Sequence, residues 1–168
     1  MSAHPQATLA MRPMLPEDVP LLAEIFRAAI EELTGDDYNE SQQEAWAAIA
    51  VDEDAFGKKL ASELTLIATV QSAPVGFASL RGKDHIDMLY VHPGAAGQGV
   101  ASMLLDALEK LAGGRGAKSL TVDASDNAQG FFAKRGYVAK QRNSITINGE
   151  WLANTTMQKT LSSGGGQS

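Results

Sequence analysis

The stretch Asp87-Met-Leu-Tyr-Val-His-Pro-Gly-Ala-Ala-Gly-Gln-Gly-Val-Ala-Ser-Met-Leu-Leu105 decides the fold expected for this chain. Its apolar run, residues 88–91, predicts a buried strand, which His92-Pro93 ends because proline cannot donate to a sheet ladder. Gly94, Gly97 and Gly99 follow, and a helical pattern of apolar residues begins directly after them. This order leaves backbone N–H groups unpaired at the positive end of a helix dipole. The stretch therefore predicts a phosphate or pyrophosphate site, with a glycine-rich turn that only closes a βα unit as the alternative.

Length and composition indicate an ordinary globular protein. The 168 residues are 44% hydrophobic and 20% charged, and we expect one domain over residues 1–161 followed by a disordered, glycine-rich tail over 162–168. No apolar run reaches the ~20 residues of a membrane span. The start of the chain lacks the order of a secretory signal, and there is no cysteine. The net charge of −6 argues against a nucleic-acid surface. We expect a cytoplasmic protein with no nucleic-acid or membrane partner.

The pattern of elements predicts a mixed α/β (α+β) fold with a largely antiparallel sheet. Strands are expected at 8–12, 65–70, 75–80, 85–91, 119–122, 138–147 and 151–158, and helices from 16, from 41, at 54–60, from 100 to the glycines at 113–114, and at 128–135. Ser41 to Glu44 has the form of a capping box, and residues 125–127 offer caps for the helix that follows them. Residues 72–74 and Asn148-Gly149 predict hairpin turns.

Two nucleotide-binding classes compete for the glycine loop. A P-loop requires Lys-Ser/Thr after its last glycine, but Val100-Ala101 stand there, which excludes it. A dinucleotide fingerprint would use Gly97 and Gly99, with Asp123 at about the expected distance along the chain. Ser102 replaces its third glycine, and the chain has a single βαβ unit, so this class is disfavoured.

Two motifs together resemble the GNAT superfamily of N-acetyltransferases, and the resemblance extends over residues 8–160. The family's pyrophosphate-loop pattern, Gln/Arg-x-x-Gly-x-Gly/Ala, falls on Ala96-Gly-Gln-Gly-Val-Ala101. A second signature, Asn/Ser-x-x-Ala-x-x-Phe-Tyr-x-x-x-Gly-Phe, falls on Ser125-Asp-Asn-Ala-Gln-Gly-Phe-Phe-Ala-Lys-Arg-Gly-Tyr137. The N-terminal half is most similar to small uncharacterised bacterial members of the family.

The resemblance implies a GNAT fold, in which a central, mostly antiparallel twisted sheet is splayed at the acyl-CoA site and flanked by helices. It implies acetyl-CoA as co-substrate and no metal. The cofactor contacts that it implies are Leu89, Tyr90 and Val91 on the strand, Gly97, Gln98, Gly99, Val100, Ala101 and Ser102 at the loop, and Ser125 and Phe132 after the next strand. Ser125 as a plain helix cap and Phe132 as a core residue are the alternatives.

Two departures from the family pattern affect the expected chemistry. Ala96 stands where the family has Gln or Arg, so backbone amides must hold most of the pyrophosphate, with Gln98 as a possible side-chain substitute. Phe132 stands where many relatives have a tyrosine that protonates the leaving thiolate. A thiol with a pKa of about 8.5 leaves tolerably without that proton. Water, Tyr90 or Ser125 are the remaining candidates for the general acid.

The implied reaction is direct attack of an amine on the thioester, with both substrates bound together. Because an amine is largely protonated at neutral pH, the site needs a general base. Asp87 is the first candidate, since a carboxylate in an apolar strand is costly unless it is used or paired. His85, two residues earlier and on the same face of a regular strand, is the second. An Asp87 satisfied by an arginine and a solvated His85 are the structural alternatives.

The acceptor is expected to be a small-molecule or peptide amine, and the sequence does not identify it. Tyr38 and Trp46, in the first helical region, would wall its pocket, unless they belong to the core. A homodimer is possible. A domain that binds acyl-CoA as a sensor without turnover is the alternative to an enzyme.

Overall fold

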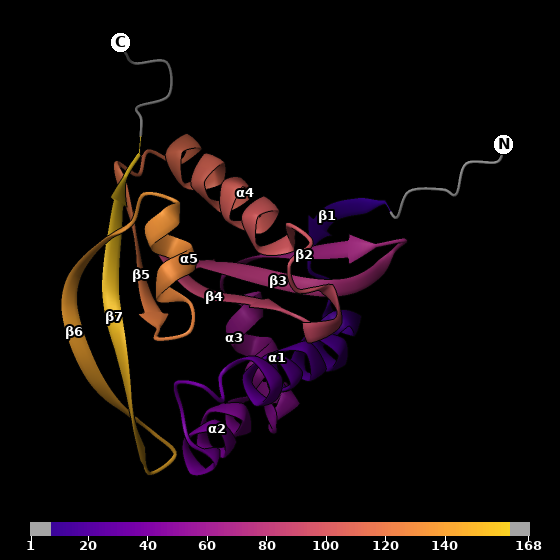
Figure 1. Ribbon diagram of the computed structural model, residues 1–168. Helices are drawn as coiled ribbons and strands as arrows, with labels where there is room; N and C mark the ends of the chain where they lie inside the picture. The colour runs from indigo at the N-terminus through magenta and orange to yellow at the C-terminus, as the bar shows by residue number, and fades with distance from the viewer. Residues whose placement is uncertain (1–7, 162–168) are drawn as a thin grey trace, which may run out of the picture.

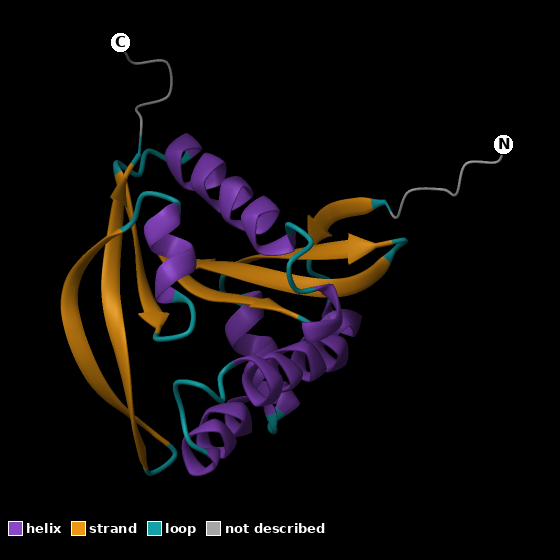
Figure 2. Cartoon of the chain, viewed as in Figure 1, coloured by secondary structure: helices purple, strands orange, loops and turns teal. Residues whose placement is uncertain are grey.

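The computed structural model describes residues 8–161, which build one seven-stranded sheet with helices on both faces (Figures 1 and 2). The strands lie in the order β1-β2-β3-β4-β5-β7-β6, and each pair of neighbours is antiparallel except β4 and β5. The strands are β1 (Leu9–Pro13), β2 (Leu64–Val70), β3 (Ala73–Arg81), β4 (His85–Val91), β5 (Ser119–Ser125), β6 (Val138–Ile147) and β7 (Glu150–Thr160). The helices are α1 (Val19–Leu33), α2 (Glu40–Ala47), α3 (Glu53–Ala61), α4 (Val100–Gly114) and α5 (Gln129–Lys134), with short 3₁₀ turns η1 (Pro16–Asp18), η2 (Ala48–Ala50) and η3 (Pro93–Ala95). This is the mixed, mostly antiparallel architecture that the sequence predicts.

The two faces of the sheet carry separate hydrophobic clusters. Helices α4 and α5 cover one face and α1 to α3 cover the other, as Figure 1 shows. Helix α4 buries residues at helical spacing, among them Leu104 and Leu108, because its apolar side chains fall on one stripe. On the opposite face Phe26 and Phe56 pack with Phe77 of β3. No helix within residues 8–161 is long and apolar enough to cross a membrane.

Strands β4 and β5 pair over only two residue positions. His85 aligns with Thr121 and Ile86 with Val122, after which the two strands diverge (Figure 1). The predicted splay is therefore present, and it begins directly after Ile86, so that Asp87 is the first residue of β4 without a partner on β5. Since β5 continues in an unbroken ladder with β7, the gap divides the sheet into a β1–β4 half and a β5–β7 half.

Several local predictions are confirmed and others need correction. Asn148 and Gly149 both have positive φ and form the β6–β7 turn as predicted. The β2–β3 turn lies at Gln71-Ser72, which adopt positive φ, and not at 72–74.

The predicted helix caps need correction. The capping box of α2 is made by Asn39 and Gln42 instead of Ser41 and Glu44. No side chain caps α5, and Ser125 is the last residue of β5. The expected tail, 162–168, lies outside the described residues.

Candidate active site

The glycine loop presents unbonded amides at the start of α4. Gly97 and Gly99 have φ of 77° and 82°, a region that favours glycine, and Gly99 is the N-cap, which has no side chain to fill the helix end. Met103 N is the first amide of this turn with a partner, the Gly99 carbonyl at 3.0 Å, and no described residue accepts from the amides of residues 100–102. Gln98 Nε2 donates to the Gly94 carbonyl at 3.3 Å, so its side chain folds back on the loop.

The edge of β4 that faces the gap offers further free amides. His92 N donates to the Val75 carbonyl at 2.8 Å, on the β3 side. In an extended strand successive amides point to opposite sides, so the amides of Tyr90 and Met88 also face β3. The amides of Leu89 and Val91 therefore point into the gap, where β5 no longer pairs with β4.

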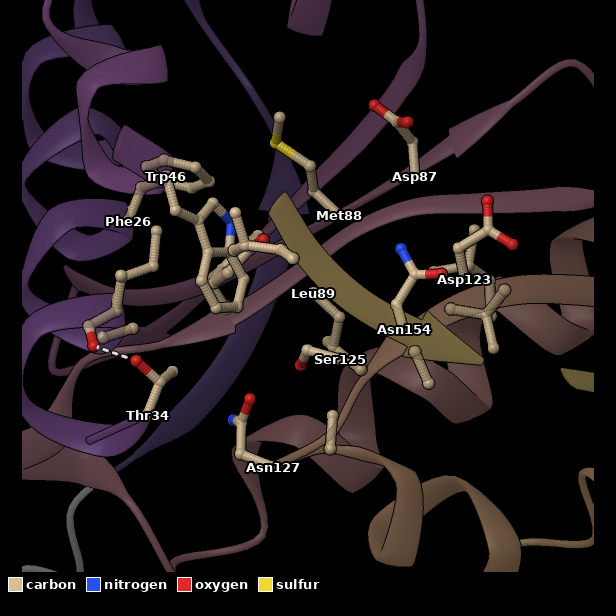
Figure 3. Close-up of a pocket in the computed structure, with 18 of the residues that line it drawn as sticks. Phe26, Thr34, Trp46, Asp87, Met88, Leu89, Asp123, Ser125, Asn127 and Asn154 are labelled. Carbon is tan, nitrogen blue, oxygen red and sulfur yellow. Dashed lines mark hydrogen bonds between the residues drawn. The ribbon is translucent and has the colours of Figure 1, made fainter. Parts of the chain in front are cut away.

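A cavity of about 370 Å³ occupies the gap between the diverging strands (Figure 3). Its lining includes nine of the predicted site residues, namely Tyr38, Trp46, His85, Asp87, Leu89, Tyr90, Val91, Ser125 and Phe132. The six predicted loop residues, Gly97 to Ser102, do not line it. They lie at the N-terminal end of α4, beyond the end of β4. The structure thus separates a cavity suited to a narrow organic ligand from an amide-rich end suited to an anion.

Asp87 sits at a β-bulge. Ser79 of β3 pairs with Met88 and Leu80 pairs with Ile86, which leaves Asp87 as the extra residue of β4. A bulge re-aims side chains, and here Asp87 turns toward Lys59 of α3, on the same face as Met88. Lys59 Nζ lies 3.0 Å from Asp87 Oδ2, and Arg81 Nη1 lies 3.3 Å from Oδ1. The Asp87 side chain is 12% exposed and lines the cavity.

His85 is held against β5 and is half-buried. Its Nδ1 lies 2.7 Å from Thr121 Oγ1, and its Nε2 lies 3.9 Å from Asp123 Oδ2. Burial lowers the pKa of His85, with Arg81 adding to the effect and the nearby acidic groups opposing it. In a neutral imidazole one ring nitrogen donates and the other accepts, so with Nδ1 bonded to Thr121 the second nitrogen, Nε2, has no hydrogen bond among the described residues.

Aromatic side chains form the wall opposite the charged groups. Tyr90 packs edge-on against Phe26 with ring centroids 4.7 Å apart, and Trp46 packs against Tyr38 at 5.4 Å. Burial raises the pKa of Tyr90 far above its usual value, which opposes its ionisation. The Tyr38 hydroxyl donates to the Ala153 carbonyl at 2.6 Å and accepts from Asp126 N at 2.9 Å. Tyr38 therefore lines the cavity with its ring while its hydroxyl joins the two halves of the fold.

Two residues from the second motif lie on the other side of the gap. Ser125 is the last residue of β5 and lines the cavity together with Leu89 and Asn127 (Figure 3). Phe132 of α5 is buried, packs against Phe131 and Tyr137 with centroids 5.3 Å away, and still borders the cavity. Phe132 has no group that donates a proton, so that role falls to another residue or to water.

Three charged residues around Asp87 were not predicted from the sequence. Lys59 and Arg81 line the cavity, and Glu63 lies behind Lys59, with its Oε2 3.6 Å from Lys59 Nζ. These residues are far apart in the sequence and belong to no motif, so only the fold brings them together. Among residues 8–161, no group of three or more His, Cys, Asp or Glu side chains is arranged to hold a metal ion.

Comparison with known proteins relates the chain to one family. The family model described as "Acetyltransferase (GNAT) domain" matches residues 34–161. The chain is 35% identical over 150 residues to the uncharacterized N-acetyltransferase YafP of Escherichia coli strain K12. This aligned region covers 89% of this chain and 95% of YafP. It is 30% identical over 127 residues to the peptidyl-lysine N-acetyltransferase YjaB of Salmonella typhimurium, covering 74% of this chain and 69% of YjaB.

Solved structures share the fold. A crystal structure from Rhodopseudomonas palustris, described as "GCN5-Related N-acetyltransferase: Aminotransferase, Class-II", is 66% identical, with a TM-score of 0.91 over 95% of this chain and 100% of that chain. The PaiA N-acetyltransferase of Thermoplasma acidophilum in complex with coenzyme A has a TM-score of 0.75 at 19% identity, over 91% and 99% of the two chains. YncA of Salmonella typhimurium, a structure that contains acetyl-CoA, has a TM-score of 0.63 at 18% identity, over 96% and 99%.

Proposed function

The chain belongs to the GNAT acetyltransferase family, and we propose that it transfers the acetyl group of acetyl-CoA to an amine by direct attack within a ternary complex. The observation that carries this proposal is the gap that opens after Ile86, because it leads from the free amides at the α4 N-terminus into a cavity with an acidic side chain at its wall. An elongated thioester with an anionic end fits this arrangement. Relatives of the same fold contain coenzyme A or acetyl-CoA.

In this proposal the cofactor lies along the gap. The amides at residues 97–102 hold the pyrophosphate, helped by the helix dipole, and Gln98 contributes its backbone because its side chain bonds Gly94. The pantetheine arm follows Leu89, Tyr90 and Val91 on one side and Ser125 and Phe132 on the other. The Leu89 or Val91 amide is the donor for the oxyanion that develops on the thioester.

The chemical step follows from the groups around the cavity. The amine nitrogen attacks the thioester carbon, the C–S bond breaks, and coenzyme A leaves as a thiolate. Asp87 receives the proton that the nitrogen loses, directly or through a water, and His85 is the second candidate for this role. Water supplies the proton for the thiolate, since Phe132 has none to give.

The proposed acceptor is a small-molecule or peptide amine that enters beside Tyr38 and Trp46. YjaB, a relative at 30% identity, is a peptidyl-lysine N-acetyltransferase, so a lysine side chain belongs in any panel of acceptors. We place the reaction in the cytoplasm, with no nucleic-acid or membrane partner, and a homodimer remains a prediction. None of these assignments needs a metal ion.

The decisive experiment follows release of free coenzyme A thiol from acetyl-CoA in the presence of single amines. The panel covers polyamines, amino acids, aminoglycosides, peptide N-termini and a lysine peptide, and mass spectrometry checks the acetylated product. We expect one class to accelerate thiol release with equimolar N-acetyl product. Acetyl-CoA binding by calorimetry with no product from any class would favour a sensor module, and protection by NAD(P) without binding of acetyl-CoA would contradict the proposal.

A further inference from the structure

A second carboxyl group lies behind Asp87, out of contact with the cavity. Glu63 precedes β2 in the sequence, and its side chain is only 4% exposed. Lys59 Nζ lies 3.6 Å from Glu63 Oε2 and 3.0 Å from Asp87 Oδ2, so one ammonium group serves two carboxyls. Glu63 Oε1 is buried and has no hydrogen-bond partner among residues 8–161. A buried carboxylate that is incompletely paired costs several kcal/mol, so this arrangement calls for an explanation.

The groups that face Glu63 come from three elements. Lys59 extends from α3, Ser79 and Arg81 from β3, and Asp87 from β4, with His85 farther along the same strand. Burial raises the pKa of Glu63 most, and the neighbouring Asp87 carboxyl raises it further, while Ser79 and Lys59 act in the opposite direction. Arg81 pairs with Asp87 only and is 57% exposed, so water screens its charge. Glu63 therefore takes up a proton more readily than an exposed glutamate does.

We propose that Glu63 is a positioning residue for Asp87, and that the two carboxyls, joined through Lys59, act as one proton acceptor for the attacking amine. Asp87 lines the cavity and takes the proton from the nitrogen. The proton then passes to Glu63, and Asp87 is again a carboxylate. After the C–S bond has broken, the proton returns through Asp87 to solvent, and both carboxyls are again in their starting protonation states. This inference rests on the proposed transfer to an amine.

The pairing explains how an aspartate beside two cations serves as a base. Lys59 and Arg81 both place positive charge beside Asp87, and positive charge near a carboxylate opposes its use as a base. A second carboxylate in the same site repels the first, so the pair takes up its first proton more readily than an isolated Asp87 would. Glu63 supplies this repulsion without occupying space that the substrate needs.

The test compares pH profiles of kcat/KM for wild type, Glu63→Gln, Asp87→Asn and the double variant. Glu63→Gln keeps the size of the side chain and should lower the plateau of kcat about 10-fold or more. It should also move the acid limb of the profile about one pH unit or more to lower pH, while the KM for acetyl-CoA stays unchanged. The double variant should be no slower than Asp87→Asn, because Glu63 acts only through Asp87. Glu53→Gln, an exposed glutamate at the start of α3, is the matched control and should leave the profile unchanged.

Lys59→Met should shift the acid limb of the pH profile in the direction opposite to Glu63→Gln. Loss of the shared ammonium should move the acid limb to higher pH, whereas Lys58→Met, its exposed neighbour on α3, should not move it. An unchanged acid limb in Glu63→Gln would show that Glu63 has a structural role only. The same conclusion would follow if the fold-losses of kcat/KM in the two single variants multiplied in the double variant.

A readout independent of turnover separates this inference from the proposed function. In carbon-detected NMR of the full chain, the Glu63 carboxyl should titrate above the usual pKa of glutamate and should return toward that value in Asp87→Asn. A normal Glu63 titration overturns the pairing even in an active enzyme. Absence of turnover together with a coupled titration overturns the acetyl transfer and leaves the pairing intact.

Discussion

At the scale of single residues, the backbone of β4 determines what Asp87 can do. The bulge turns two consecutive side chains, Asp87 and Met88, to one face, so that a charged and an apolar side chain both border the acceptor side of the cavity. A regular strand would have directed Asp87 and Met88 to opposite faces. The same bulge places Asp87 on the face that also carries Tyr90, which a regular alternation from Asp87 excludes.

Asp87→Asn should lower kcat by about 10²–10⁴-fold while acetyl-CoA binds as in wild type, because the amide keeps the size of the side chain but loses its basicity. The loss should shrink at high pH, where a larger fraction of the amine is already neutral. Steady-state kinetics between pH 6 and pH 10, with acetyl-CoA affinity from calorimetry, provide the measurement.

Asp84→Asn is a suitable control for this variant, since Asp84 is exposed in the turn before β4. It should leave both kcat and affinity unchanged. If Asp87→Asn keeps full kcat at pH 7 with the best acceptor, the base is His85 or a chain of waters. If it loses activity equally at every pH and melts at a lower temperature, Asp87 serves the fold through Lys59 and Arg81.

Gly99→Glu should abolish acetyl-CoA binding. Gly99 has a φ of 82° and forms the N-cap of α4, so a side chain there strains the backbone and places a negative charge at the expected pyrophosphate position. Gly116→Glu introduces the same charge at another glycine of positive φ (90°) in open space, and should bind acetyl-CoA normally. Wild-type affinity in Gly99→Glu, measured by calorimetry, would remove the loop from the cofactor site.

Sequence reasoning reached some residues of the site and missed others for a physical reason. Asp87 and the glycine loop stand out because each conflicts with its local context, a carboxylate within an apolar strand and three glycines before a helix. Lys59, Glu63 and Arg81 have ordinary local contexts, on a helix end, a turn and a strand end. They belong to the site only through contacts between residues distant in the sequence, and a local sequence pattern does not reveal such contacts.

At the scale of elements, hydrogen bonds from α2 and the residues before it hold the β6–β7 hairpin over the cavity. Tyr38 bonds the Ala153 carbonyl, Gln42 Nε2 donates to the Trp151 carbonyl at 2.7 Å, and Asn148 Nδ2 donates to the Ala45 carbonyl at 2.8 Å. Figure 1 shows α2 beside the turn of this hairpin. The contacts close one end of the gap, so the cavity takes its shape from elements that are distant in the sequence.

Turns were predicted correctly where the residue types strongly favour one backbone conformation. Asn148-Gly149 accepts positive φ at low cost, and the β6–β7 turn forms there. The β2–β3 turn was misplaced because Gln71 and Ser72 are poor indicators of positive φ, whereas Pro74 suggested a turn and lies instead within β3. The cap of α2 was misplaced by two residues, since Asn39 and Ser41 both have acceptable side chains and only the loop geometry selects Asn39.

The attachment of β1 to the turn η1 predicts a pH dependence of stability. The Asp18 carboxylate accepts from both terminal nitrogens of Arg12, at 2.7 and 2.8 Å, and from Leu15 N at 2.8 Å. These bonds, that to Arg12 first, lower the pKa of Asp18 below its usual value. A lowered pKa in the folded state stabilises the fold above the unfolded pKa of about 3.9, and this stabilisation is lost as the pH falls toward the folded value.

Asp18→Asn should therefore lower the free energy of unfolding by about 1–3 kcal/mol at pH 7, and the difference from wild type should shrink as the pH falls below about 4. Urea denaturation at several pH values measures it. Glu17→Gln, an exposed neighbour, should change little at any pH. A difference that is constant with pH would show that the Asp18 charge does not contribute and that only side-chain shape matters.

At the scale of the whole molecule, the gap leaves few backbone hydrogen bonds between the two halves of the sheet, and the hydrophobic cluster under α4 and side-chain hydrogen bonds join them elsewhere. The β4–β5 ladder joins them at two residue pairs, and the Tyr38 hydroxyl adds bonds on the opposite side of the cavity. A ligand in the gap would contact both halves at once. It would therefore stabilise their relative placement in addition to the fold of each, with a free energy that grows as RT ln(1 + [L]/Kd).

Hydrogen exchange should reveal this bridging directly. The amides of Leu89 and Val91, and those of residues 100–102, have no partner within the described chain and should exchange within seconds in the free protein. Saturating acetyl-CoA should slow both groups, because the thioester and pantetheine accept from the strand amides and the pyrophosphate accepts from the helix amides. ADP, which has the pyrophosphate but lacks the pantetheine arm, should slow only residues 100–102. Amides inside the β2–β3 ladder, such as that of Leu66 opposite Ala78, should not respond on this timescale with either ligand. Equal protection of Leu89 and Val91 by both ligands would mean that the gap does not hold the pantetheine arm, since the shorter ligand cannot reach it.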